Sequence, residues 1–223
     1  IKTSDIESQH IFALVVGNFG TGKTTLAKTL KPESKTLILS AESGLLSLKD
    51  YSIDAVVIKT LDDLYEVFNF LQSDTEYENI FCDSLTEISE QIFANLKNLP
   101  EYKNNGFAIY GDYSAKIVAL LKAFRDKYNI YMTALEKTVT ENYQDAIAID
   151  MVQKSLSRKV PALFDLVLHL KILPNSNDEL TRVLCCDQTT SPLAKDRSGK
   201  LNPYEKPDLQ MINDKIFNGN KCR

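Results

Sequence analysis

The segment from Gly17 to Thr24 reads GNFGTGKT, follows the spacing G-x-x-x-x-G-K-T, and constrains the fold more than any other part of the chain. An unbroken apolar run, Ile11 to Val16, precedes it and predicts a strand buried on both faces of a parallel sheet. A helix is expected to follow and to end near Lys31 and Pro32, because proline cannot continue the helical hydrogen bonds. A strand, a glycine-rich loop and a helix in this order indicate a P-loop.

A P-loop binds phosphate because its backbone N–H groups and the N-terminus of the following helix point toward the anion. Lys23 is expected to reach the β- and γ-phosphates of ATP, and the Thr24 hydroxyl is expected to ligate magnesium. The alternative is a glycine-rich turn that matches the spacing by chance, which the predicted strand and helix on either side argue against. The predicted nucleotide-binding residues are Gly17, Asn18, Phe19, Gly20, Thr21, Gly22, Lys23, Thr24 and Thr25.

The run from Ile80 to Asp83 predicts an apolar strand that ends in a carboxylate, where P-loop enzymes carry the second residue that holds magnesium. Asp83 is therefore the predicted Walker B residue and, with Thr24, the predicted metal site. The alternative is an aspartate that only caps the helix expected to follow. Ser84 comes next, at the position where AAA+ enzymes carry a glutamate.

Glu42 directly follows the strand expected at Thr36 to Ala41. The carboxyl ends of parallel strands face the ligand crevice of an α/β sheet, so Glu42 is the predicted catalytic group that orients or deprotonates the attacking water. The alternative is a solvated acid in a loop.

The remaining pattern alternates strands and helices, which predicts an α/β domain with a mostly parallel central sheet flanked by helices. Thr60 is the expected N-cap of a helix with apolar residues at helical spacing, and Lys137 to Val152 predicts a protruding β-hairpin. Residues 1–204 are predicted to form one ATPase domain and residues 205–223 a polar C-terminal tail. The other expected elements are strands at Ala55–Ile58, Ile130–Leu135, Leu166–Leu170 and Arg182–Cys186, and helices within Ile88–Leu96, Ile117–Phe124 and Ser155–Leu163.

Composition adds few positive indications. The formal net charge of -4 gives no overall attraction to nucleic acid or to an anionic membrane. Neither an apolar stretch of membrane-helix length nor an apolar N-terminal signal segment is found in the sequence, so a cytoplasmic location is expected. The four cysteines fit no metal pattern and are expected to be reduced. In the sequence, His10 and His169 are not accompanied by other residues that could bind a metal ion with them, and neither is assigned a role.

Several segments resemble the RecA-like ATPases. LSAESG is similar to the strand that carries their catalytic glutamate, and FCDSLTE is similar to a Walker B strand that ends in Asp-Ser. The segment AKDRSG, from Ala194 to Gly199, is similar to the Lys-x-Arg segment of RecA-like hexameric helicases. Together with GDYS, PALFDLVLHL and AKDRSGKL, residues 11–203 look most like the single-domain phage proteins described as RecA-like single-strand-annealing recombinases.

This resemblance implies an ATPase that assembles head to tail into a ring or filament, in which Lys195 and Arg197 reach the ATP of a neighbouring subunit. The alternative for these two cations is an exposed basic loop. RecA ends the strand that corresponds to Ile130 to Leu135 with a glutamine that senses the γ-phosphate, whereas this chain offers Thr133 or Glu136.

The resemblance also implies that single-stranded DNA binds along the loops Asn98 to Asp112 and Lys137 to Lys159, which line the inner face of RecA-like assemblies. Their cations and aromatic rings suit phosphates and stacked bases. Acids nearly cancel the charge of the second loop, so a solvated hairpin is the alternative. The candidate DNA-binding residues are Lys103, Tyr110, Lys137, Lys154, Arg158 and Lys159.

The leading hypothesis is a phage-type recombinase that hydrolyses ATP with magnesium, binds single-stranded DNA and anneals complementary strands. It would work beside a single-strand-binding protein in the host cytoplasm. An oligomeric helicase or helicase loader is the first alternative, and a nucleotide-regulated switch without DNA is the second. A small-molecule kinase fits least, because it would not need Lys195 and Arg197 to act between subunits.

Overall fold

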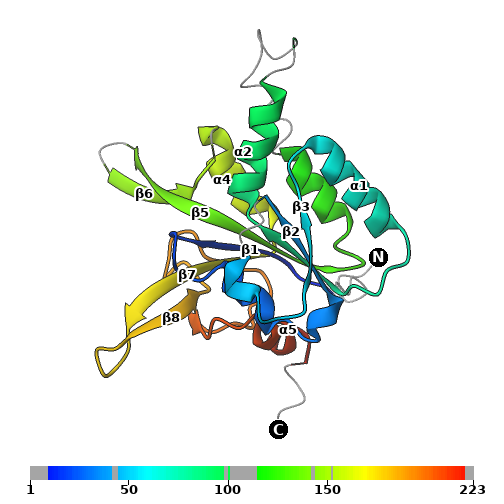
Figure 1. Cartoon of the computed structure of the whole chain (residues 1–223). Helices are drawn as coiled ribbons and strands as arrows, with labels where there is room; N and C mark the ends of the chain where they lie inside the picture. Colours follow the sequence, from blue (N-terminus) through cyan, green and yellow to red (C-terminus); the bar gives the residue numbers. More distant parts are fainter. Residues whose placement is uncertain are drawn as a thin grey trace, which may run out of the picture.

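A mostly parallel β-sheet runs through the centre of the molecule (Figure 1). The computed structural model describes residues 10–41, 45–97, 100, 115–141, 144–151 and 153–218. Within them, eight strands follow the order β10-β8-β7-β1-β5-β4-β2-β3, while β6 pairs with β5 and β9 with β7. The predicted α/β fold with a mostly parallel sheet is confirmed. The strands are β1 Phe12–Gly17, β2 Thr36–Ser40, β3 Asp54–Val57, β4 Asn79–Asp83, β5 Asn129–Glu141, β6 Gln144–Ile149, β7 Leu166–Pro174, β8 Leu180–Cys185, β9 Lys195–Asp196 and β10 Tyr204–Glu205.

Helices cover both faces of this sheet. The α-helices are α1 Leu61–Gln72, α2 Leu85–Leu96, α4 Lys154–Leu163 and α5 Leu209–Asn218, and residues 115–123 are also helical. Three short 3-10 helices are η2 Thr24–Thr29, η3 Glu33–Lys35 and η4 Leu46–Leu48. In the described ranges, every helix is too short or too polar to cross a lipid bilayer.

Side chains of β1 alternate between two apolar cores, one on each face of the sheet. Phe12, Leu14 and Val16 belong to the core that α1, α2 and α4 cover. Ala13 and Val15 belong to the core that η2 and α5 cover. Because both faces are buried, this strand has an unbroken apolar sequence. Figure 1 shows the corresponding layers, with α1, α2 and α4 on one side of the sheet and α5 on the other.

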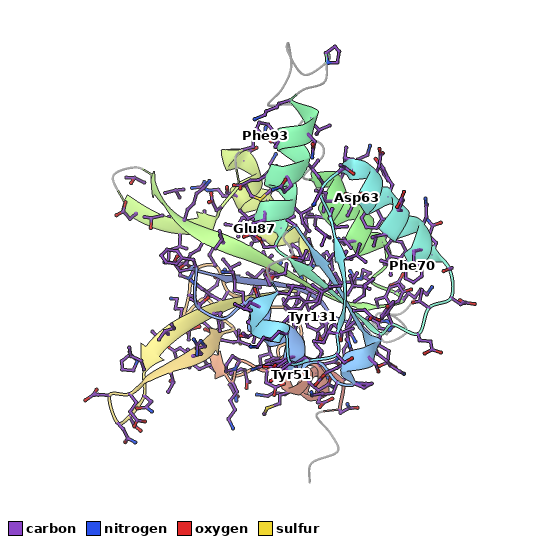
Figure 2. The ribbon with its side chains drawn as sticks, in the orientation of Figure 1. Tyr51, Asp63, Phe70, Glu87, Phe93 and Tyr131 are labelled. Atoms are coloured by element: carbon purple, nitrogen blue, oxygen red, sulfur yellow. The ribbon has the colours of Figure 1, made fainter. Side chains whose placement is uncertain are left out.

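The start of α1 is fixed by local hydrogen bonds, as the sequence predicts. The Thr60 side chain accepts a hydrogen bond from the Asp63 backbone N–H, and the Asp63 carboxylate accepts one from the Thr60 N–H (Asp63 is labelled in Figure 2). This capping box satisfies two donors that a helix start otherwise leaves unpaired. Leu64 and Phe68, which lie at helical spacing, are buried, whereas Tyr65 is 39% exposed.

The helix predicted after the P-loop is shorter and tighter than expected. It is the 3-10 helix η2, which ends at Thr29, and its backbone bonds span three residues, as from Leu26 N to Lys23 O. The hydroxyls of Thr25 and Thr29 donate to backbone carbonyls three residues earlier. Threonine side chains that bond to the backbone in this way compete with regular α-helical geometry.

The predicted protruding hairpin is confirmed as β5 and β6, which pair antiparallel from Glu136 opposite Ile149 to Glu141 opposite Gln144 (Figure 1). The first half of β5 is buried in the central sheet, where Ile130 pairs with Phe12. One long strand therefore belongs to both the core and the hairpin.

The prediction that residues 205–223 form a polar tail is wrong for residues 205–218. Glu205 lies in β10, which pairs with β8, and α5 follows. Leu209, Ile212 and Ile216 of α5 are buried against the second core. These three residues lie on one helical face, and their burial outweighs the polar composition of the segment. The domain therefore extends at least to residue 218.

Candidate functional site

The GNFGTGKT loop lies at the carboxyl end of β1, between β5 and β7. Gly17 is closely surrounded: a Cβ atom at this position would lie 2.7 Å from Leu170 O and 3.0 Å from Thr21 Oγ1. Gly22 has φ +101°, a left-handed conformation that favours glycine. These two glycines let the chain turn tightly at the edge of the sheet, as the P-loop prediction requires.

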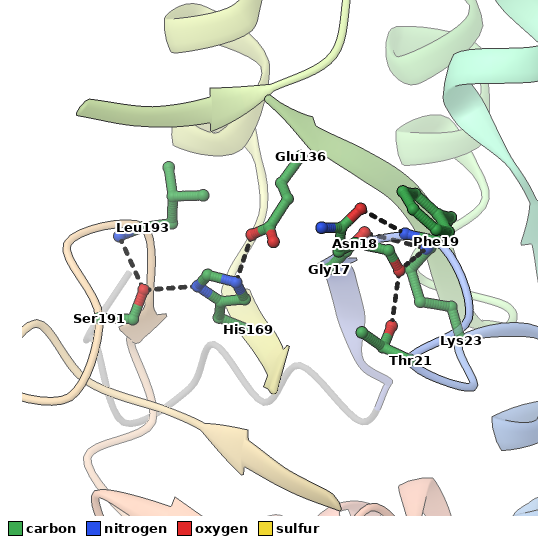
Figure 3. A network of polar contacts seen from close by, with 9 residues as sticks. All are labelled: Gly17, Asn18, Phe19, Thr21, Lys23, Glu136, His169, Ser191 and Leu193. Atoms are coloured by element: carbon green, nitrogen blue, oxygen red, sulfur yellow. Dashed lines mark hydrogen bonds and ion pairs between the residues drawn. The ribbon is translucent and has the colours of Figure 1, made fainter. Parts of the chain in front are cut away.

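Lys23 is held across the loop that it follows. Its side-chain Nζ donates hydrogen bonds to Gly17 O and Asn18 O, each at 2.9 Å (Figure 3). The residue is buried, and burial lowers the pKa of Lys23, while the nearby carboxylates of Asp83, Glu87 and Glu136 oppose that shift. The ammonium is thus positioned within the P-loop, where the predicted phosphate contact requires it.

The two predicted magnesium ligands are in contact with each other. Thr24 Oγ1 donates a 2.7 Å hydrogen bond to Asp83 Oδ2, and Thr133 Oγ1 donates a 2.6 Å bond to Asp83 Oδ1. Asp83 is the last residue of β4, as predicted. A hydroxyl and one carboxylate at the P-loop fit magnesium, which usually takes only one or two protein carboxylates and completes its shell with phosphate and water. Thr24 and Asp83 would hold the ion.

A cavity of about 230 Å³ opens beside these residues. It contains a second carboxylate, Glu87, in the first turn of α2 (Figure 2). The predicted catalytic residue Glu42 lies outside the described residues, and its role stays a prediction. Ser40, two positions earlier at the end of β2, lines the cavity. The lining residues are Phe19, Gly20, Lys23, Thr24, Ser40, Leu45, Asp83, Ser84, Glu87 and Leu135.

A buried polar chain that the sequence did not predict lies on the other side of the P-loop. His169 Nε2 is 2.5 Å from Glu136 Oε2, and His169 Nδ1 is 2.7 Å from Ser191 Oγ (Figure 3). Glu136 follows Leu135, which pairs with Gly17 of the P-loop. His169 and Ser191 are each 1% exposed, so this Ser-His-Glu arrangement is closed to substrate and is not the active site of a serine hydrolase.

Lys195 and Arg197 lie away from the P-loop of their own chain. β9 pairs with the beginning of β7, whereas the P-loop follows the end of β1, which runs parallel to β7. Lys195 Nζ donates to Pro161 O and Ala162 O at the end of α4. Arg197 donates to Ala162 O and forms an ion pair with Asp165. Within the subunit, both cations stabilise the C-terminal end of α4.

The candidate DNA-binding residues fall into three groups. Lys103 and Tyr110 lie outside the described residues. Lys137 lies at the base of the hairpin, and its Nζ is 2.9 Å from Asp150 Oδ1 and also donates a hydrogen bond to Met151 O. The Asp150 carboxylate therefore compensates the charge of Lys137. The others are on α4: Lys154 is its first residue, and Arg158 and Lys159 are exposed.

Comparison with known families supports the assignment from the site. The profile of a family described as AAA domain matches residues 10–198, which include β1, the P-loop, Asp83 and the β5–β6 hairpin. A comparison with curated proteins found no match. The matched range contains every residue described above for the phosphates and magnesium. The chain therefore belongs to the AAA domain family and is a P-loop AAA-type ATPase domain.

Proposed function

We propose that this ATPase domain binds single-stranded DNA, anneals complementary strands and couples these activities to the ATP cycle. The observation that carries the proposal is the course of β5. Leu135 pairs with Gly17 at the P-loop, and the following residues, from Glu136 to Glu141, form one strand of the hairpin. A shift of the P-loop on nucleotide binding would therefore be passed along a single strand to the hairpin.

The P-loop residues would bind and activate ATP. Lys23 would exchange its two backbone carbonyl partners for the β- and γ-phosphate oxygens, and Thr24 and Asp83 would hold magnesium, which would supply positive charge beside the transferred phosphoryl group. Glu42 is proposed to orient the attacking water. These roles require ATP at the loop and do not depend on DNA.

The surface between the hairpin and α4 supports the proposal of single-stranded DNA binding. A cavity of about 200 Å³ lies there, and its lining is largely apolar. Arg158 lines this cavity, and Lys159, next in the chain, is exposed. Cations for phosphates beside an apolar surface for bases are typical of sites for single-stranded nucleic acid. The lining residues are Val139, Ala146, Ile147, Ala148, Ser157, Arg158, Pro161, Pro192 and Leu193.

The oligomer in this proposal is a head-to-tail ring or filament, and a single-strand-binding protein is its proposed partner. The resemblance to RecA-like annealing proteins supports both. The Arg197 side chain is 53% exposed, so a neighbouring subunit has access to it even while it pairs with Asp165.

The test measures binding of a fluorescently labelled single-stranded oligonucleotide at several salt concentrations, with and without an ATP analogue. Arg158→Ala with Lys159→Ala should weaken binding and make its salt dependence shallower, by a slope of about one for each phosphate that the protein no longer neutralises. The matched control is Lys49→Ala with Lys206→Ala, two exposed lysines near the opposite face of the sheet. Annealing of complementary oligonucleotides should be slower with the Arg158/Lys159 variant than with the Lys49/Lys206 control.

Three results would contradict the proposal. Absence of salt-dependent DNA binding by the wild-type protein would favour a nucleotide-regulated switch. DNA binding with strand unwinding and no annealing would favour a helicase. An equal loss in the Arg158/Lys159 variant and in the Lys49/Lys206 control would remove α4 from the DNA site.

A further inference from the structure

Strands β7 and β8 pair antiparallel and form a two-stranded ribbon, one face of which extends away from the P-loop. Val16 of β1 pairs with His169 and Gly17 is the last residue of β1, so the residues of β7 after Leu170 extend beyond the end of β1. Directly paired residues of an antiparallel ribbon have their side chains on the same face, and this face repeats every second residue. From the P-loop outward, its pairs are Leu170 with Leu184, Ile172 with Arg182, and Pro174 with Leu180.

This face changes from buried to exposed along its length. Leu170 and Leu184 are buried in the second core, and Leu170 O is the atom nearest to the position that a Cβ atom would take at Gly17. Farther out, Ile172 is 42% exposed and Leu180 is 74% exposed. An apolar surface open to solvent therefore begins at the rim of the P-loop.

Arg182 lies on this surface and is anchored to the P-loop backbone. Its Nε donates a 2.7 Å hydrogen bond to Thr21 O, and Nε lies 3.1 Å from the position that a Cβ atom would take at Gly22. Arg182 is exposed, and it forms no ion pair with a carboxylate within the described ranges. The P-loop turns its N–H groups toward phosphate, so a cation bound to one of its carbonyls lies at the rim of the phosphate site.

The sheet order gives the direction in which the nucleotide extends. The contact between Thr24 and Asp83 marks the magnesium end of the site, on the side of β1 where β5 and β4 lie. β7 and β8 lie on the other side of β1. Because the nucleoside is at the end of the nucleotide opposite the γ-phosphate, it is directed toward the β7–β8 ribbon.

We infer that Arg182 and Ile172 bind the nucleoside of ATP, with the planar guanidinium stacked on the base and Ile172 beside it. A guanidinium can stack on an aromatic ring while one of its N–H groups keeps a hydrogen bond to the protein. The inference rests on ATP binding at the P-loop and is independent of DNA binding.

The experiment compares the affinities of ATP, ADP and tripolyphosphate, each with magnesium, by calorimetric titration of the full chain. Arg182→Ala should raise Kd for ATP and ADP about tenfold and leave Kd for tripolyphosphate unchanged. Arg182→Lys keeps the charge but loses the planar group, so it should also bind ATP more weakly. Lys171→Ala is the matched control, because Lys171 pairs with Val183 on the opposite face of the same ribbon.

Wild-type affinity for ATP in Arg182→Ala would overturn the assignment. An equal loss of ATP and tripolyphosphate would also overturn it, because Arg182 would then bind phosphate. Full recovery of ATP binding in Arg182→Lys would exclude stacking of the guanidinium. Failure of the wild-type protein to bind ATP would instead contradict the nucleotide-binding function itself. Thermal melting without nucleotide checks that each variant is folded.

Discussion

His169 Nε2 lies 2.5 Å from Glu136 Oε2, at the edge of the P-loop, and the opposite ring nitrogen faces the Ser191 hydroxyl. The Leu193 backbone N–H also contacts this hydroxyl oxygen, at 3.4 Å. Nδ1 shares a hydrogen bond with the Ser191 hydroxyl, whereas the contact of Nε2 with Glu136 Oε2 lacks hydrogen-bond geometry and is an ion pair only when the ring is protonated. The imidazole thus connects β5, just after the residue that pairs with Gly17 of the P-loop, with the loop that precedes β9.

This burial predicts a pH dependence of stability. Desolvation lowers the pKa of His169 below its ordinary value of 6.5, although the Glu136 charge opposes the shift. The unfolded chain therefore takes up this proton at a higher pH than the folded chain does. The stability that comes from burying the neutral imidazole is fully present above pH 6.5. As the pH falls below 6.5, the free energy of unfolding decreases by at most about 1.4 kcal/mol per pH unit for this one proton.

His169→Gln should flatten this dependence between pH 7 and about pH 5, because glutamine does not titrate. The measurement is the free energy of unfolding by urea at each pH. His10→Gln is the matched control: burial also lowers the pKa of His10, but that residue is only partly buried, so its removal should have the smaller effect. A wild-type slope in His169→Gln would show that another group carries the acid sensitivity.

Lys23→Ala should weaken ATP binding about a hundredfold, because it removes a buried cation positioned for the phosphates. Melting without nucleotide should stay close to wild type, since the strands and helices of the core are unchanged. Lys28→Ala is the control: this lysine is on η2 and lies over the ring of Tyr51. Wild-type ATP affinity in Lys23→Ala would refute the P-loop assignment.

Two carboxylates compete for the role of orienting the attacking water. Glu42 is the predicted residue, and Glu87 lines the cavity beside Lys23 and Asp83. Glu42→Gln should keep ATP binding and lower turnover by at least about a hundredfold, whereas Glu87→Gln should hydrolyse ATP near the wild-type rate. Single-turnover hydrolysis measures both. The opposite ranking would place the catalytic carboxylate on α2 and contradict the RecA-like mechanism.

Local signals predicted the parts of the site that depend on spacing along the chain. The P-loop glycines, Lys23 and Thr24 lie within eight consecutive residues, and Asp83 ends a short apolar run. Thr60, the predicted N-cap of α1, accepts its hydrogen bond from the Asp63 backbone N–H, three residues later. Each of these features needs only neighbours in sequence and the rule that parallel strands end at the same edge of a sheet.

The contacts that the sequence could not predict depend on strand order. Glu136 and His169 meet because β5 and β7 lie on either side of β1, and Arg182 reaches Thr21 because β8 follows β7 in the sheet. Nothing in the local sequence fixes that order. The helical spacing of Leu209, Ile212 and Ile216 was a readable signal for α5, but the polar residues around it favoured a tail.

Arg197 is proposed to act on the ATP of a neighbouring subunit, although it pairs with Asp165 in its own subunit. Arginine suits this role, since its fixed charge can stabilise the transferred phosphoryl group, an effect on the order of a thousandfold where such residues are known. Arg197→Ala should bind ATP almost normally and hydrolyse it poorly. Arg125→Ala removes another cation that pairs with Asp165 and should stay active.

A mixing experiment separates action between subunits from a structural role. Arg197→Ala and Glu42→Gln should each be inactive alone, because each lacks one group of a site that two subunits share. When they assemble together, some interfaces contain Glu42 from one subunit and Arg197 from the other, so ATPase activity should reappear. If co-assembled mixtures stay inactive, or if Arg125→Ala is as impaired as Arg197→Ala, then Arg197 serves only to hold the end of α4, and the trans mechanism is wrong.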